Sequence, residues 1–259
     1  MGVTPLGRTC HLIVDDKYKI LFNFIPKVSC STWKKVFKLL RKTHSNGHVR
    51  YLSTYENDEK KYRLENYRKA LFVREPISRT LSLYLHKFNS RDPKRIPIQR
   101  AWENMYGKNI VKLYRKGYTT LSSYTEETEP LLNITFSEWI QYITDIGDGI
   151  KLSQITDHFL PQHLVSTPCA IQYDFIGHFE NLTTEAPYML KFLGVDNVVA
   201  YPHVRESKAV NTLVNEYKQV SFDLINRLQK YYHADYELFG YSFTDTLHSF
   251  VAGATDEGE

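Results

Sequence analysis

Short apolar runs punctuate the chain and predict buried strands. There are three of them, Lys19–Ile25, Ala70–Val73 and Ile171–Gly177. Their length, and the charged or turn-forming residues around them, are typical of strands covered on both faces. Helical patterns follow the first two runs within a few residues, over 33–40 and 77–88. Strand, loop and helix units in this order favour an α/β fold with a central parallel sheet flanked by helices.

Two helix starts can be placed from local signals. Ser31 and Thr32 can cap the helix that follows the first strand, because their hydroxyls accept from backbone N–H groups. Pro76 can occupy the first turn of the helix after the second strand.

The rest of the chain is predicted to be mainly helical. A charged helix is expected over 56–67, a short amphipathic helix over 136–143, and a helix-rich C-terminal half with helices from 185 to 232. No internal repeat or firm boundary divides the sequence. We therefore expect a single domain over residues 1–259, with a frayed tail after about residue 244.

Charge and hydropathy change this picture only slightly. Lys and Arg total 33 against 29 Asp and Glu, a formal net charge of +4. This excess suits an anionic ligand or a polyanionic substrate, but many proteins with neutral ligands carry the same excess. No apolar run approaches the roughly 18 residues that span a bilayer, and no signal-peptide pattern opens the sequence. The sequence is therefore compatible with a cytosolic protein and with a protein whose N-terminal anchor lies outside this sequence.

Cysteines and sequons leave the compartment open. Cys10, Cys30 and Cys169 form neither a CxxC pair nor a Cys/His metal motif, and their odd number permits one disulfide with a free thiol or three thiols. Sequons at Asn133 and Asn181 would be glycosylated only in a secretory lumen.

The link between the first strand and its helix, Pro26–Cys30, is the first candidate binding site. A short loop that leads into a helix presents backbone N–H groups and the positive end of the helix dipole, which suit phosphate. Lys27 adds a cation, and the hydroxyl donors nearby are Ser29, Ser31 and Thr32. The Gly-x-x-x-x-Gly-Lys-Ser/Thr pattern of nucleoside triphosphatases is absent from this loop. An ordinary strand-to-helix turn would explain the same residues without a ligand.

A second candidate site follows the second strand. Arg74 lies at the carboxyl end of that strand, where ligands bind in open α/β sheets. Arg79 and Ser82 follow on the next helix, and an arginine fork with a hydroxyl could hold another phosphate. Two phosphate sites at adjacent strand ends fit a ligand with two separated phosphates, such as 3′-phosphoadenosine-5′-phosphosulfate.

The chain carries three characteristic blocks: Phe-Ile-Pro-Lys-Val-Ser-Cys-Ser-Thr-Trp-Lys-Lys at 24–35, Phe-Val-Arg-Glu-Pro-Ile-Ser-Arg-Thr-Leu-Ser at 72–82, and Pro-Cys-Ala-Ile-Gln-Tyr-Asp-Phe-Ile-Gly at 168–177. The first two resemble the 5′-phosphosulfate and 3′-phosphate motifs of the Golgi carbohydrate sulfotransferases, the group with the chondroitin and dermatan 4-O-sulfotransferases. The third is similar to a further segment of that family. The resemblance extends from about residue 10 to about residue 243. Ser31-Thr32 stand where the family usually has Thr-Asn, and Lys35 where Arg is common.

The resemblance implies a P-loop-type sulfotransferase fold and a transfer of a sulfuryl group from 3′-phosphoadenosine-5′-phosphosulfate, without a metal. The residues implied in holding the 5′-phosphosulfate are Lys27, Val28, Ser29, Cys30, Ser31, Thr32 and Trp33. Arg74 and Ser82 would hold the 3′-phosphate, with Arg79 in support. Lys27 would also act in catalysis by neutralising charge that develops on the leaving phosphate.

The acceptor implied by the resemblance is an anionic glycan, with the 4-hydroxyl of N-acetylgalactosamine in chondroitin or dermatan as the first expectation. Segments on the acceptor side match the family more weakly, so a glucuronyl 3-O or uronyl 2-O acceptor stays open. A catalytically silent glycan-binding module of the same fold and a P-loop kinase stay open as well. The family also implies the Golgi lumen, a type II membrane protein whose anchor is missing from this sequence, and no nucleic-acid partner.

Sulfuryl transfer needs a general base to take the proton of the acceptor hydroxyl. His158 occupies the place of a family Glu-His-Trp segment, and the neighbouring Asp157 or another carboxylate could orient it. His48 and His163 are the other candidates, and each of the three could instead have a purely structural role.

Overall fold

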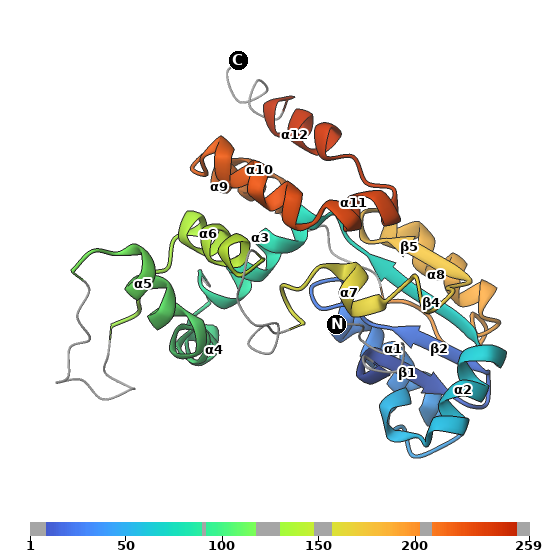
Figure 1. The fold of residues 1–259 in the computed structure, drawn as a ribbon. Helices are drawn as coiled ribbons and strands as arrows, with labels where there is room; N and C mark the ends of the chain where they lie inside the picture. The colour runs from blue at the N-terminus through green and yellow to red at the C-terminus, as the bar shows by residue number, and fades with distance from the viewer. Residues whose placement is uncertain (1–8, 90–91, 118–129, 148–156, 203–208, 253–259) are drawn as a thin grey trace. The chain divides into compact units, whose positions relative to one another are not determined.

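A five-stranded sheet and a series of helices make up the fold of the computed structural model, which describes residues 9–89, 92–117, 130–147, 157–202 and 209–252 (Figure 1). The strands are β1 (Leu12–Asp15), β2 (Ile20–Asn23), β3 (Arg50–Tyr51), β4 (Arg68–Val73) and β5 (Phe175–His178). The helices are α1 (Cys30–Lys42), α2 (Asn57–Asn66), α3 (Pro76–Lys87), α4 (Ile96–Trp102), α5 (Lys108–Tyr114), α6 (Phe136–Gly147), α7 (Gln162–Ser166), α8 (Leu182–Phe192), α9 (Ala209–Tyr217), α10 (Phe222–Tyr231), α11 (His233–Phe239) and α12 (Phe243–Ala252).

The sheet has the strand order β3-β1-β2-β4-β5. The three strands predicted from apolar runs, β2, β4 and β5, are mutually parallel neighbours. The predicted α/β fold class with helices around a central sheet is therefore confirmed, with one correction. The sheet is mixed, because β1 pairs antiparallel with both β2 and β3.

The antiparallel edge arises from a tight turn that the apolar pattern did not reveal. Only four residues, 16–19, join β1 to β2, and a connection that short can link antiparallel strands only. The carboxylate of Asp15 accepts the backbone N–H groups of Lys17 and Tyr18, both at 3.1 Å, which fixes the turn.

Burial explains why the parallel strands read as continuous apolar runs. All four residues of β2 and the last four of β4 are buried, as expected for central strands covered on both faces. β5 is shorter than predicted and begins at Phe175, because the side chain of Asp174 turns to accept the N–H of Lys69 at 2.7 Å. Within β5, a Cβ at Gly177 would lie 2.4 Å from the Phe72 ring, so only glycine fits there.

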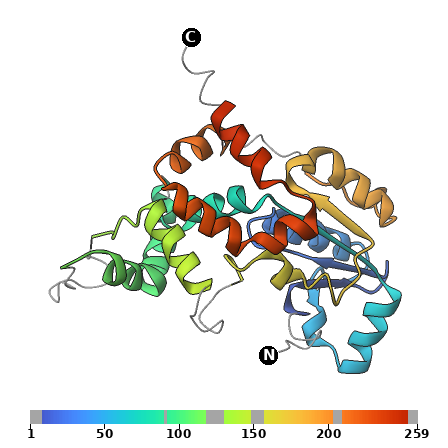
Figure 2. The ribbon, with the colours of Figure 1, turned by 45° about the horizontal axis from the view of Figure 1, so that its top comes forward.

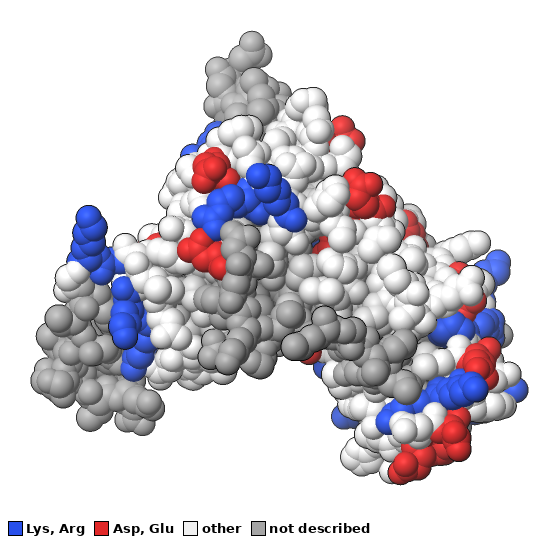
Figure 3. Space-filling model, viewed as in Figure 1, with Lys and Arg blue, Asp and Glu red and all other residues white. Residues whose placement is uncertain are grey.

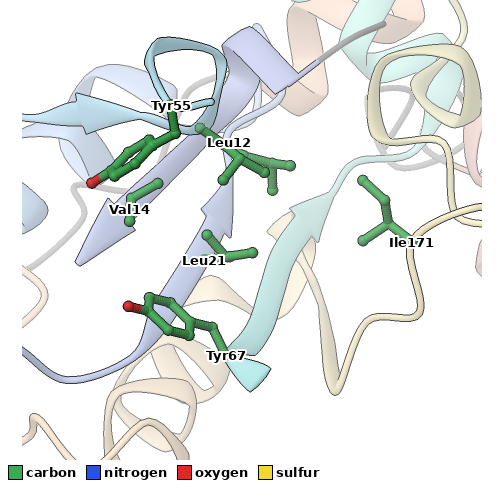
Figure 4. Close-up of a cluster of buried hydrophobic side chains, with 7 residues drawn as sticks. Leu12, Val14, Leu21, Tyr55, Tyr67 and Ile171 are labelled. Atoms are coloured by element: carbon green, nitrogen blue, oxygen red, sulfur yellow. The ribbon is translucent and has the colours of Figure 1, made fainter. Parts of the chain in front are cut away.

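A hydrophobic cluster holds the antiparallel edge of the sheet to its surroundings (Figure 4). Leu12, Val14 and Leu21 contribute from β1 and β2 and are fully buried. Tyr55 and Ile171 join them from outside the sheet. Ile171 thus packs the segment before β5 against this edge, and the backbone N–H of Asp174 donates to the carbonyl of Lys69 at 2.8 Å.

Two compact units divide the chain. Unit 1 consists of Met1–Pro76, Thr156–Ser207 and Ala234–Tyr241, and unit 2 of Ile77–Ile155, Lys208–His233 and Ser242–Glu259. Unit 1 contains the whole sheet with α1, α2, α7 and α8; α8 lies beside β5 in both views (Figure 1, Figure 2). The expectation of a single domain stays a prediction.

The described residues of unit 2 are mainly helical and form an aromatic interior. Its helices α6 and α10 pack side by side (Figure 1, Figure 2). Trp139 is fully buried and its ring lies 5.0 Å from that of Phe88. The ring of Tyr84 lies 4.9 Å from that of Phe136, and its hydroxyl donates to the carbonyl of Ile134.

The charged helix predicted over 56–67 is α2. Its surface carries side chains of both charges. Glu56 precedes it in a capping box with Glu59. Acidic and basic side chains lie next to each other over α2 (Figure 3). Arg63 of this helix binds Asp16, which lowers the carboxyl pKa of Asp16. The surface of α2 is thus a mixed, paired surface rather than a patch of one sign.

Two helix boundaries differ from the sequence predictions. The first helix does not begin after a Ser31-Thr32 cap: its N-cap is Ser29, in a left-handed conformation, and α1 starts at Cys30. The tail is helical where fraying was expected, because α12 covers Phe243–Ala252; residues 253–259 lie outside the described part of the chain. No helix in the described ranges has the length and apolarity needed to cross a membrane.

Candidate active site

The loop between β2 and α1 reverses the chain with unusual backbone angles. Lys27 and Ser29 have φ values of 69° and 52°, in the left-handed region that L-residues other than glycine rarely adopt. Such conformations cost roughly 1–2 kcal/mol each and persist only where the surroundings enforce them. Val28 lies between them, and its buried side chain anchors the loop in the interior of the protein.

The N-terminus of α1 is left open by its own cap residue. The carbonyl of Ser29 accepts the N–H groups of Thr32 and Trp33 at 3.0 and 3.1 Å, which starts the helix. The Ser29 side chain makes no capping bond and is instead hydrogen-bonded to the hydroxyl of Tyr201, with 2.6 Å between the oxygens. Cys30 is half-buried and Ser31 exposed at this end. The helix start therefore presents its positive dipole end without an acidic or capping side chain of its own.

Trp33 holds α1 against the sheet. It is fully buried, and its ring centroid lies 4.9 Å from that of Phe22 and 5.1 Å from that of Phe72. A third ring, Tyr201, packs at 4.4 Å. Since Val28 is buried too, the side chains of these two predicted binding residues support the loop from inside.

The loop after β4 is held by side chains from elsewhere in unit 1. Gln162 pairs with the backbone of Arg74: its Oε1 accepts the Arg74 N–H at 2.9 Å, and its Nε2 donates to the Arg74 carbonyl at 2.7 Å. The guanidinium of Arg74 lies over the ring of Phe179, 4.3 Å from its centroid. Its Nη1 donates to the carbonyl of Lys27 at 3.2 Å, so the two loops are joined directly.

Glu75 completes this second loop. Its N–H donates to the carboxylate of Glu180 at 2.9 Å, and its own carboxylate accepts the hydroxyl of Tyr236 at 2.8 Å. Tyr241 donates to the other oxygen of Glu180, and burial raises the pKa of the Tyr241 phenol well above its usual range. Residues from before α8 and from the C-terminal part of unit 1 thus close around Glu75.

Arg79 and Ser82 lie on α3. They belong to unit 2, which begins at Ile77, whereas Arg74 belongs to unit 1. Arg79 is almost completely buried and Ser82 is half-buried. Their part in a 3′-phosphate site stays a prediction.

The three candidate bases have different surroundings. Asp157, expected to orient His158, instead accepts from Nε2 of His11 at 2.8 Å. His158 itself is half-buried. His163 is oriented by a buried carboxylate, since its Nδ1 donates to Asp235 at 2.7 Å. His48 is exposed, on the loop after α1.

Cys10 adds a third polar group beside the His11–Asp157 pair. The ligand-type atoms of Cys10, His11 and Asp157 lie within 4.8 Å of one another, a grouping that could hold a metal ion and that the sequence did not indicate. Both ring nitrogens of His11 already make hydrogen bonds, to Asp157 and to the carbonyl of Phe24. No disulfide joins Cys10, Cys30 and Cys169, all of which lie in the described part of the chain.

Sequence reasoning missed Gln162, Tyr201 and His11. Gln162 acts on a loop 88 residues earlier in the chain, and Tyr201 contacts a serine 172 residues away. No local pattern connects positions so distant. Tyr201 could at most have been noted as one aromatic residue among many, and His11 as a histidine beside a cysteine.

Comparison with known proteins assigns this chain to a protein family. The chain matches the sulfotransferase family over residues 10–242 and belongs to that family. The resemblance to carbohydrate sulfotransferases inferred from the sequence is confirmed.

Curated relatives make the comparison more specific. Carbohydrate sulfotransferase 14 of Danio rerio is 31% identical over 261 residues, which cover 95% of this chain and 66% of the relative. Its Homo sapiens counterpart is 33% identical, covering 75% of this chain and 48% of the relative. Carbohydrate sulfotransferase 11 of Rattus norvegicus is 26% identical, covering 92% and 68%. The chain thus spans between about half and two thirds of the length of these relatives, and no solved structure matches it significantly.

Proposed function

We propose that this chain is the catalytic domain of an enzyme that transfers a sulfuryl group from 3′-phosphoadenosine-5′-phosphosulfate to a hydroxyl of a glycan. The observation that carries the proposal is the hydrogen bond from Arg74 to the carbonyl of Lys27. It joins the loops after two neighbouring parallel strands, β2 and β4. Ligands of open α/β sheets bind at this edge, beyond the carboxyl ends of the strands.

In this proposal the two loops bind the two ends of the nucleotide. The open start of α1 and the hydroxyls of Ser29, Ser31 and Thr32 hold the 5′-phosphosulfate, while Lys27 contributes charge. Arg74 holds the 3′-phosphate, with Ser82 and Arg79 as further contacts predicted from the sequence. The support is chemical: an uncapped helix start suits an anion, and a buried arginine is a strong phosphate ligand.

The reaction in this proposal is an in-line displacement at sulfur. The acceptor oxygen bonds to sulfur as the bond between sulfur and the bridging phosphate oxygen breaks, and the electron pair leaves with adenosine 3′,5′-bisphosphate. Lys27 neutralises the charge that gathers on that phosphate, which is the larger part of catalysis in transfers of this type. The acceptor proton passes to a general base.

His158 is the base in this proposal. A chain of two hydrogen bonds ties its neighbour to the first loop: Asp157 accepts from His11, whose other nitrogen donates to the carbonyl of Phe24. Phe24 precedes Lys27 by three positions, so the residue before His158 is connected to the first loop, which supports His158 as the base.

His163 is the second candidate, on a different observation. A histidine whose Nδ1–H is fixed by a buried carboxylate keeps Nε2 as its basic atom, the arrangement of an oriented general base, and Asp235 supplies that carboxylate. Single alanine variants at both positions separate the candidates: loss of the base lowers turnover and leaves nucleotide binding unchanged.

For the acceptor we propose an anionic glycan of the chondroitin or dermatan type, sulfated at the 4-hydroxyl of N-acetylgalactosamine, and for the location the Golgi lumen. The support is the resemblance of the phosphate motifs to that group and similarity to proteins named carbohydrate sulfotransferases. A glucuronyl or uronyl acceptor is the competing outcome of an acceptor screen.

Calorimetric titration of the chain with adenosine 3′,5′-bisphosphate, without metal and alongside ATP with Mg²⁺, tests the proposal. We expect tight binding of the bisphosphate only, followed by transfer of radiolabelled sulfate to desulfated chondroitin or dermatan. Binding of ATP alone would contradict the proposal and indicate a kinase. Bisphosphate binding without transfer to any glycan would indicate a catalytically silent module.

A further inference from the structure

Tyr201 reaches the start of α1 from a distant part of unit 1. Its hydroxyl is hydrogen-bonded to Oγ of Ser29, with 2.6 Å between the oxygens, and the side chain of Thr32 lies close enough to oppose the rise in the pKa of this phenol. Ser29 and Thr32 are residues to which the proposed function assigns the 5′-phosphosulfate. Three hydroxyl groups therefore lie near the start of α1, where the N-cap side chain makes no capping bond.

The position of the Tyr201 ring is set by packing. Its centroid lies 4.4 Å from that of Trp33, which is itself fully buried between Phe22 and Phe72. Tyr201 is half-buried, so part of the residue remains accessible to solvent. A ring held in this way aims its hydroxyl at the loop without a large cost in side-chain entropy.

Counting protons shows what this group can offer to a ligand. Each of the three hydroxyls has one proton, and the hydrogen bond between Tyr201 and Ser29 uses one of them. Protons therefore remain that can be donated to another acceptor. The three side chains contain no carboxylate, so an anion would meet donors and no repelling charge.

We propose that Tyr201 is a cosubstrate-binding residue whose hydroxyl, together with those of Ser29 and Thr32, donates to the 5′-phosphosulfate end of the nucleotide. The inference rests on the proposed function and adds to it a residue from outside both sequence motifs. Burial raises the pKa of the Tyr201 phenol above its ordinary value of 10.0, so the group keeps its proton and remains a donor at neutral pH.

The test uses Tyr201→Phe, which removes the hydroxyl and keeps the ring on Trp33. Two probes are titrated, adenosine 3′,5′-bisphosphate and adenosine 3′-monophosphate, which lacks the 5′ group. We expect Tyr201→Phe to weaken binding of the bisphosphate about 10-fold, the size of one lost hydrogen bond to a charged group. Binding of the 3′-monophosphate should be unchanged. Tyr188→Phe is the matched control, because Tyr188 is an exposed tyrosine of α8.

Each result has a distinct meaning. If wild-type protein binds no bisphosphate, the proposed function fails and the Tyr201 inference falls with it. If wild-type protein binds and Tyr201→Phe binds equally well or more tightly, only the Tyr201 inference is overturned. An equal loss for both probes would also overturn it, because the effect would then be a general one on the fold.

A measurement on the wild-type protein keeps the inference testable even if the variant does not fold. Nitration of tyrosines, followed by mass spectrometry, is compared with and without the bisphosphate. We expect the ligand to protect Tyr201 and to leave Tyr188 equally reactive. Unchanged reactivity of Tyr201 under saturating bisphosphate would contradict the inference.

Discussion

The two loops that follow β2 and β4 have the same place in the fold but are built in opposite ways. The first loop, 24–29, contains two residues in left-handed conformations and leads into a helix whose start is open. The second loop, 74–75, has no positive φ value and is bound on several sides by Gln162, Glu180 and Tyr236.

The two loops illustrate two different ways in which the proposed anion sites are built. The first loop leads into a helix start without a side-chain cap, carries the hydroxyl of Ser29, and stores its strain in the backbone. The second loop is a rigid support that presents one guanidinium, with its backbone hydrogen bonds already satisfied inside the protein. We infer that the first loop does the chemistry at sulfur and the second fixes the position of the nucleotide.

Lys27→Ala should have the largest effect. Removing the cation that is proposed to meet the charge on the leaving phosphate should lower kcat by about 100- to 1,000-fold, as for other groups that stabilise charge in a transition state. Binding of adenosine 3′,5′-bisphosphate should fall less. Steady-state transfer of radiolabelled sulfate measures the effect.

The control for Lys27→Ala is Lys38→Ala, because Lys38 is an exposed lysine farther along α1. Its removal changes net charge equally and should leave kcat unchanged. If both variants lose activity alike, the effect comes from overall charge, and the assignment of chemistry to the first loop is wrong.

Arg74→Ala should mainly affect binding. Loss of a charge-assisted contact to the 3′-phosphate costs about 1.5–3 kcal/mol, or roughly 10- to 100-fold in Kd. The same variant should bind adenosine 5′-phosphosulfate, which has no 3′-phosphate, as well as the wild type does. A loss that is equal for both nucleotides would show that Arg74 acts by holding Lys27 in place, and would blur the distinction between the loops.

Gln162→Leu should lower the stability of the second loop with little change in the chemistry. The variant keeps a similar volume but removes both hydrogen bonds to the Arg74 backbone and leaves that N–H and carbonyl unsatisfied. We expect a loss of about 2 kcal/mol in the free energy of unfolding. Urea denaturation measures it, and an unchanged midpoint would mean that the loop is not supported as described.

The sequence was sufficient for the parallel part of the fold and insufficient for its edge. The buried runs of β2 and β4 and the helix of α2 are strong local signals, since burial on both faces and capping leave a mark in consecutive residues. β1 offers only three consecutive apolar residues, Leu12–Val14, and β3 is two residues long. The pairing of β1 with β2 depends on a turn fixed by the Asp15 carboxylate, which a search for apolar runs does not detect.

The residues of the candidate site also fall into two groups, those that the sequence indicated and those that it did not. Lys27 and Arg74 could be singled out because each follows a predicted strand within a short motif. Tyr201 and Gln162 could not, because their contacts are made across 172 and 88 residues and depend on tertiary packing alone. The orientation of His163 by Asp235 was equally inaccessible to the sequence, since the two lie 72 residues apart.

Ser29→Gly should have the smallest effect on stability, and it tests the stored strain directly. Glycine adopts a φ of 52° freely, which relieves about 1 kcal/mol, but its greater freedom in the unfolded chain costs about 0.5–1 kcal/mol. Measured in a Tyr201→Phe background, in which Ser29 has already lost its partner hydroxyl, the free energy of unfolding should therefore change by less than about 0.5 kcal/mol in urea denaturation. Glu75→Gly, the matched change in the second loop, gains no such relief and strands the hydroxyl of Tyr236, so it should lose about 1–3 kcal/mol. Equal losses in the two variants would mean that the loops do not differ in how they hold their backbone.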